Sequence, residues 1–179
     1  ARVQLNGNTR GATRRGTMVD GRSMSNRTMT RRAVCGVLAT AAFARPMMAA
    51  EPPSVTVYRD PNCGCCLGWV QHLRKNGFVV AVEETSDLES VRNRYRVPGD
   101  LAGCHTALID GYVIEGHVPA TAIRRLLAER PKALGLAVPG MPMGSPGMEG
   151  GTPERYAAVL FTADQRSVFM QFIGADPVG

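Results

Sequence analysis

The sequence has no apolar run long enough to cross a bilayer. The mostly apolar run at residues 33–44 holds twelve residues and no other reaches 18, whereas a spanning helix needs about 20. The chain after residue 50 also lacks excess positive charge. Nine of the 21 basic residues and one of the 15 acidic residues lie in residues 1–50, so this segment carries +8 and the remainder −2. Because phosphate binding needs a basic face, this balance argues against nucleic-acid binding.

The sequence also lacks the patterns that mark several common enzyme classes. No Ser–His–Asp order, no paired carboxylates and no glycine-rich phosphate loop stand out, and no internal repeat is visible. Cysteine is scarce but concentrated: the chain has five, and three of them lie within residues 63–66. Such crowding is poorly suited to joining distant parts of a fold, so these thiols are the first candidates for a functional site.

Residues 1–50 have the features of an export leader. Arg31 and Arg32 precede the apolar run, and small residues follow it up to Ala50. This order is typical of a secretory signal peptide, so we predict cleavage near Ala50 and a periplasmic location. Paired arginines are typical of the twin-arginine route but also occur in ordinary secretory signals, and the route stays open. Cys35 would leave with the signal.

The first 23 residues are rich in arginine, glycine and threonine and have no apolar period. We expect disorder there and a real translation start at Met24 or Met29. The predicted organisation is therefore a disordered leader and signal peptide over residues 1–50, followed by one domain over residues 51–179.

Strand and helix patterns alternate after residue 50. Alternating β-branched residues indicate strands, apolar residues three or four apart indicate helices, and Asp110-Gly111 indicates a tight hairpin turn. Ser86 and Glu89 have the spacing of a capping box, in which each side chain binds a free backbone N–H. The predicted elements are a strand at 54–58, a helix at 65–76, a strand at 78–82, a short helix after 86, a hairpin at 106–114, a helix at 119–130, a Gly/Pro/Met-rich loop at 134–153 and a closing hairpin at 157–172.

This order, with a Cys-x-x-Cys turn between the first strand and the first helix, is the layout of thioredoxin. We predict an α/β, thioredoxin-like fold with a central mixed β-sheet, flanking helices and an extra C-terminal β-hairpin. His72 is expected on a solvated face of the first helix, and Arg92, Arg94 and Arg96 on an exposed face of the second.

The turn Cys63-Gly64-Cys65-Cys66 lies where the first predicted helix begins. Free N–H groups and the positive end of the helix dipole stabilise a thiolate there, and thiolate is both a nucleophile and a metal ligand. Alignment of the strand at 106–109 with the thioredoxin layout brings Cys104 towards this turn. The alignment also puts His105 where thioredoxins have a cis-proline.

Three interpretations of Cys63, Cys65, Cys66 and Cys104 stay open. The first is two structural disulfides, as is usual for exported proteins. The second is a thiol–disulfide oxidoreductase using Cys63 and Cys66, against which the missing proline and the third thiol argue. The third, which we favour, is a soft-metal site of all four thiols.

Both Zn²⁺ and Cu(I) bind thiolates, and the methionines favour copper. Met141, Met143 and Met148 lie in the Gly/Pro/Met-rich loop, and thioether is a good ligand for Cu(I) and a poor one for Zn²⁺. Irregular packing would also explain these methionines. His105 is a candidate ligand or hydrogen-bond donor to a ligand. For His117 packing in a turn is favoured, and ligation is the alternative.

Four segments resemble the periplasmic CopG-like copper-resistance proteins, a domain of unknown function numbered 411. The resemblance extends over residues 54–172 and implies a thioredoxin-like fold, a periplasmic setting and copper binding through the cysteines, with several ions in a thiolate-bridged cluster. The ligand role is carried over to the four cysteines that match the motif. The segments that carry the resemblance are 58–66, 101–107, 111–120 and 135–142.

We therefore predict a periplasmic Cu(I)-binding protein for copper resistance, acting by sequestration or by thiolate-linked redox handling of copper. The predicted metal ligands are Cys63, Cys65, Cys66 and Cys104, with zinc less favoured than copper. The expected partners are copper ions and copper-efflux or copper-chaperone proteins, with neither nucleic acid nor membrane insertion. A metal-binding protein is favoured over an enzyme, and the alternative is a periplasmic thiol–disulfide oxidoreductase.

Overall fold

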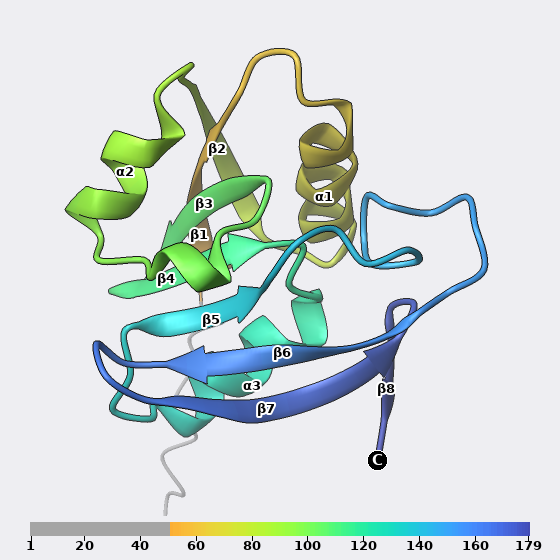
Figure 1. The fold of residues 1–179 in the computed structure, drawn as a ribbon. Coiled ribbons are helices and arrows are strands. Elements are labelled where there is room, and N and C mark those ends of the chain that lie inside the picture. Colours follow the sequence, from red (N-terminus) through yellow and green to blue (C-terminus); the bar gives the residue numbers. More distant parts are fainter. Residues whose placement is uncertain (1–50) are drawn as a thin grey trace, which may run out of the picture. The chain divides into compact units, whose positions relative to one another are not determined.

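The computed structural model describes residues 51–179, which form one eight-stranded mixed sheet with three α-helices (Figure 1). The predictions of a leader, a signal peptide and a later start lie outside these residues. The elements are β1 Ser54–Arg59, α1 Gly64–Lys75, β2 Val79–Glu84, α2 Leu88–Arg94, the 3₁₀ turn η1 Gly99–Leu101, β3 His105–Ile109, β4 Tyr112–Gly116, α3 Ala120–Glu129, β5 Gly135–Val138, β6 Arg155–Phe161, β7 Arg166–Ile173 and β8 Asp176–Val178.

The strand order is β2-β1-β3-β4-β5-β6-β7-β8. Two neighbouring pairs are parallel, β1 with β2 and β4 with β5, and the other pairs are antiparallel. Parallel neighbours need a crossover connection, and α1 and α3 supply the two crossovers. The predicted mixed sheet and the C-terminal hairpin of β6 and β7 are therefore confirmed, whereas the finer thioredoxin-like assignment stays a prediction.

Apolar side chains cover both faces of the sheet. The larger core joins α1 and α3 to one face and includes Trp69 and Ile123. A smaller core lies on the other face, beneath the chain that follows α2. Ile114 belongs to the first core and its neighbour Val113 to the second, because successive strand residues point to opposite faces. The core thus holds α1, whose first turn carries Cys65 and Cys66, firmly against the sheet.

The predicted capping box was wrong. Asp87, rather than Ser86, is the N-cap of α2, and its carboxylate accepts the Ser90 N–H at 3.0 Å. The Ser90 hydroxyl donates to the same carboxylate at 2.6 Å, which gives Asp87 two bonds that Ser86 could not match.

The predicted loop at 134–153 was wrong at its start, because residues 135–138 form the buried strand β5 between β4 and β6. Gly135 permits this close pairing, since a Cβ added there would lie 1.8 Å from the carbonyl oxygen of Val113. A four-residue strand buried on both faces has no alternation of polar and apolar residues by which the sequence could reveal it. Strand β8 was likewise not predicted.

Candidate metal centre

The structure brings the four predicted cysteines together: their sulfur atoms all lie within 4.8 Å of one another. Cys63 ends the turn after β1, Cys65 and Cys66 lie in the first turn of α1, and Cys104 directly precedes β3. Strands β1 and β3 are antiparallel neighbours with Arg59 opposite His105, so the end of β1 and the start of β3 meet at one edge. This register brings Cys104 beside a turn some forty residues earlier in the chain.

Two of these cysteines form a disulfide, Cys63–Cys66, with an S–S distance of 1.98 Å. Among the described cysteines, Cys65 and Cys104 are free thiols, and both are half-buried. The Cys65 sulfur lies between the two parts of the cluster, 3.4 Å from the Cys63 sulfur and 3.6 Å from the Cys104 sulfur. The structure therefore describes an oxidised pair beside a reduced pair.

The start of α1 supplies local electrostatic support for negative sulfur. Cys63 is the N-cap, and its sulfur accepts the backbone N–H of Cys66 at 3.3 Å. No acidic side chain lies in the first turn of the helix. The partial positive charge of the helix start is thus available to the cysteines, as the sequence indicated.

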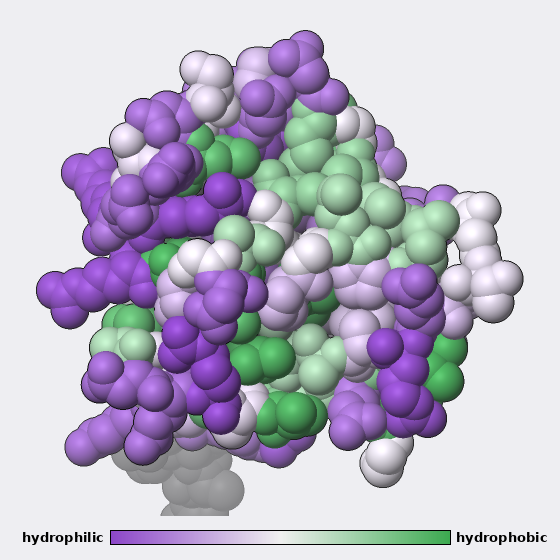
Figure 2. All heavy atoms as spheres, viewed as in Figure 1, coloured by the Kyte–Doolittle hydropathy of each residue, from purple (hydrophilic) through white to green (hydrophobic). Residues whose placement is uncertain are grey.

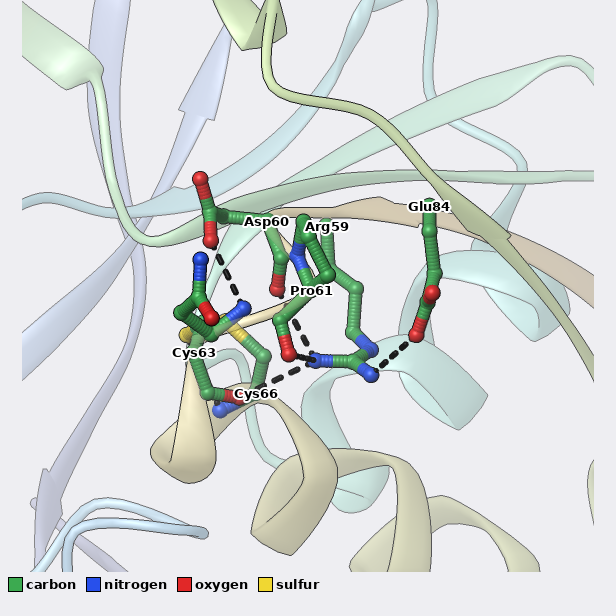
Figure 3. Close-up of polar contacts among 7 residues, drawn as sticks. Arg59, Asp60, Pro61, Cys63, Cys66 and Glu84 are labelled. Carbon is green, nitrogen blue, oxygen red and sulfur yellow. Dashed lines mark hydrogen bonds and ion pairs between the residues drawn. A yellow bond between two sulfur atoms is a disulfide. The ribbon is translucent and has the colours of Figure 1, made fainter.

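A buried arginine fixes the cysteine turn from the side that faces Glu84 (Figure 3). The Nη1 group of Arg59 donates to three carbonyl oxygens, those of Asp60 at 2.9 Å, Pro61 at 3.3 Å and Cys63 at 3.2 Å. Its Nη2 group pairs with Glu84 at 2.5 Å. Sequence reasoning missed Arg59, although a signal existed: it is in phase with the buried Val55 and Val57 of β1.

A buried carboxylate performs the corresponding role on the Cys104 side. Glu115 accepts the N–H of Gly103 at 2.8 Å and the hydroxyl of Thr106 at 2.6 Å, the residues on either side of Cys104 and His105. Arg92 pairs with Glu115 at 2.8 Å and also donates to the Gly103 carbonyl at 2.6 Å. The prediction of an exposed Arg92 was therefore wrong, since only 19% of its side chain is accessible.

The pKa of the Cys104 thiol is strongly raised. Burial raises its pKa to about 12, the hydrogen bond with Cys65 adds to the increase, and the charge of Arg92 acts in the opposite direction. The metal-free thiol is therefore protonated at neutral pH. Any ion that binds this sulfur must displace its proton.

His105 and His117 are buried beside Trp69. The His105 ring lies 4.3 Å from Trp69 and 5.1 Å from His117, measured between ring centroids. His117 Nδ1 lies 2.7 Å from the Pro146 carbonyl oxygen, whereas both ring nitrogens of His105 are unpartnered. Burial lowers the pKa of both side chains, that of His105 well below its usual value. Neither histidine belongs to the group of mutually close ligand atoms that the four sulfurs form.

The prediction that His72 lies on a solvated face was wrong, because this residue links two helices. It is half-buried, and its Nε2 accepts the N–H of Ala120 at 3.1 Å, at the start of α3. Sequence periodicity could not reveal this contact, because α3 lies 48 residues further along the chain.

The three predicted methionines lie between β5 and β6. Met141 and Met143 are exposed and Met148 is half-buried. Their loop reaches the first turn of α1, where Gly147 contacts the backbone of Cys65. The structure thus places the methionine loop next to the cysteine cluster.

Comparison with known proteins shows similarity to copper-resistance proteins. A family model described as a protein of unknown function, DUF411, matches residues 101–148. The chain is also similar to two solved structures of a copper resistance protein copG. Form 2 is 47% identical over 68% of this chain and 99% of that one, and form 1 is 47% identical over 69% and 100%, each with a TM-score of 0.65. A search of curated proteins gave no match.

Proposed function

The chain belongs to the CopG-like family of copper-resistance proteins, and from this premise we propose that it binds Cu(I) through Cys63, Cys65, Cys66 and Cys104. The observation that carries the proposal is the convergence of four sulfur atoms to within 4.8 Å of one another. Soft thiolate ligands select soft ions, among which Cu(I) fits the family. Zinc would also accept four thiolates and is the ion to exclude.

The four-ligand site requires the reduced protein. Reduction of the Cys63–Cys66 disulfide by a thiol reductant takes two electrons and two protons and yields four thiols. Each thiol then releases its proton to solvent as it binds copper. Sulfur that bridges two ions would let four cysteines hold more than one Cu(I), in line with the multinuclear cluster that we expect.

The proposed setting is the periplasm, after removal of the leader near Ala50. There the protein would sequester copper or handle it through thiolate-linked redox chemistry on a thioredoxin-like domain, and exchange it with copper-efflux or copper-chaperone proteins. None of the helices within residues 51–179 has the length and apolar character needed to cross a membrane.

An anaerobic titration of the reduced chain with Cu(I) tests this proposal. The expected result is at least one tightly bound ion per chain, with a higher affinity for Cu(I) than for Zn²⁺. The matched control is the variant in which all four cysteines are replaced by serine. Equal affinity of the wild-type chain and this variant would refute the proposal.

The disulfide itself favours a second candidate function, thiol–disulfide exchange by Cys63 and Cys66. The Cys65 sulfur, 3.4 Å from the Cys63 sulfur, is placed as a competing thiol. This function predicts catalytic turnover of a model disulfide that Cys63→Ala alone abolishes. The metal-binding function predicts no turnover and a graded loss of copper as each of the four cysteines is replaced.

A further inference from the structure

Two large thioether side chains are exposed on the loop between β5 and β6. Met141 is 55% exposed and Met143 37%, so a large part of each apolar side chain stays in contact with solvent. Figure 2 shows a pale-green, moderately hydrophobic area over α1 and the adjoining loop. Exposed methionine on a loop is poor core material, and these residues therefore need another explanation.

Hydrogen bonds hold this loop in a defined conformation. The N–H of Gly144 donates to the Met148 carbonyl at 2.9 Å, and the buried Ser145 hydroxyl donates to the Pro142 carbonyl at 2.6 Å. The Met143 carbonyl accepts the N–H of Glu154 at 2.9 Å, and the Met143 N–H donates to the Glu154 carboxylate at 3.2 Å. The backbone that carries the methionines is thus fixed by polar contacts.

The loop contacts both cysteine-bearing parts of the cluster. Gly140, which precedes Met141, donates its N–H to the Ala102 carbonyl at 3.4 Å, two residues before Cys104. Gly147, which precedes Met148, lies against α1: a Cβ there would be 2.4 Å from the Cys65 carbonyl oxygen. Gly147 also has a φ of +91°, so another residue would be strained as well as obstructed. The methionines therefore branch from backbone that borders the cluster.

Thioether and thiol differ in what they require of an incoming ion. Both are soft ligands that suit Cu(I). A thiol must lose a proton on binding, whereas a neutral thioether has none to lose and binds soft ions in its resting state. A thioether site beside a thiolate site can therefore accept the ion first and release it to the stronger ligands.

We propose that Met141, Met143 and Met148 form a second soft-metal site, which takes up Cu(I) by its thioether sulfurs and passes it to the cysteine cluster. The transfer is a ligand exchange without change of oxidation state: Cu–thioether contacts break, Cu–thiolate bonds form, and the thiol protons leave to solvent. This inference rests on the proposed function, because it assumes that the cysteines are the final copper ligands.

The site is tested first in the full chain with all four cysteines replaced by serine. The probe is Ag(I), a redox-stable analogue of Cu(I), and the readout is the NMR resonances of ¹³C-labelled methionine methyl groups, assigned with single Met→Leu variants. We expect saturable shifts at positions 141, 143 and 148 and none at Met170, which lies on β7. Absence of shifts at the three loop positions, or equal shifts at position 170, would refute the site.

The transfer step is tested in the cysteine-intact, reduced chain, which avoids any loss of stability in the serine variant. Copper is supplied as a weak Cu(I) complex, and loading is followed by stopped flow. The triple variant M141L/M143L/M148L should load about tenfold more slowly, as a barrier raised by about 1.4 kcal/mol implies, and reach the same final copper content. Leucine conserves volume, and M170L is the matched control with the wild-type rate.

The two proposals fail in different ways. If the wild-type chain binds copper and the triple variant loads at the wild-type rate, the transfer role of the methionines is refuted and the proposed function stands. If the wild-type chain binds no copper, the proposed function is refuted, and the transfer step falls with it.

Discussion

The two parts of the cysteine cluster are held in place by opposite means. The turn that leads into Cys63 surrounds a buried cation, since the Arg59 guanidinium donates to the carbonyl oxygens of Asp60, Pro61 and Cys63. The Cys104 turn surrounds a buried anion, since Glu115 accepts bonds from Gly103 and Thr106. The cation has a well-exposed partner, because the Glu84 side chain is 54% exposed, whereas the anion depends on Arg92, whose side chain is only 19% exposed.

This difference determines how much stability each part loses when its arginine is removed. Loss of Arg59 would leave Glu84 free to be hydrated, and the penalty would fall on the turn carbonyls. Loss of Arg92 would leave a carboxylate buried without a counter-charge, the more costly outcome. We therefore expect the Cys104 part to be the more sensitive of the two to loss of its cation.

The largest effect is expected from Arg92→Ala. Removal of one partner of a buried pair costs about 3–5 kcal/mol of unfolding free energy, because the remaining charge is uncompensated. Urea unfolding of the reduced, metal-free chain measures this loss. The matched control is Arg94→Ala, two residues further along α2 and exposed, which should change stability by less than about 0.5 kcal/mol. Equal stability of the two variants would contradict the assigned role of Arg92.

A smaller effect is expected from Arg59→Met, which retains most of the apolar stem. The loss should be about 2 kcal/mol, because three carbonyl oxygens of the turn lose their charged donor while Glu84 becomes hydrated. Glu84→Gln is the control and should cost less than about 1 kcal/mol, since its side chain is half-exposed. If Arg59→Met proves more damaging than Arg92→Ala under the same conditions, the ranking of the two parts is reversed.

The smallest expected effect is a loss of stability at low pH that depends on His72, the residue that connects α1 to α3. Burial lowers the pKa of His72 below its usual value of 6.5, so the folded state binds fewer protons than the unfolded state. Stability must then fall as the pH drops below about 6.5, because the protonated ring can no longer accept the Ala120 N–H. Buried His105 and His117 act in the same direction.

Unfolding free energies at pH 7 and pH 5 measure this effect, and His72→Gln is the informative variant. Glutamine does not titrate in this range and retains an acceptor, so the variant should lose less stability between the two pH values than the wild-type chain. An equal loss in both chains would show that His72 contributes nothing to the acid sensitivity.

The same two parts show how far a sequence can be interpreted. Cys63, Cys65 and Cys66 were predictable as neighbours at a helix start, because a strand, a turn and a helix are local patterns. Cys104 was predictable only by alignment of the strand at 106–109 with the thioredoxin layout, and the pairing of Arg59 with His105 now provides the physical reason.

Other features depended on tertiary partners that the sequence does not disclose. Glu115 and Arg92 are charged residues whose burial follows from their pairing, and no local pattern in β4 or α2 indicates that burial. His72 was expected in solvent because its partner belongs to another helix. Strand β5 was missed because it is short and buried on both faces. Local chemistry was therefore predictable, whereas the network that positions it was not.

The central claim is that the two parts of the cluster form one copper site. Its most direct test is an anaerobic competition titration of reduced Cys63→Ser and Cys104→Ser against a Cu(I)-chelating dye. The account predicts that both variants lose affinity for Cu(I) to a similar degree, because each removes one thiolate from the same ligand set. Wild-type affinity in Cys104→Ser, with loss only in Cys63→Ser, would contradict it and confine copper to the Cys63–Cys66 turn.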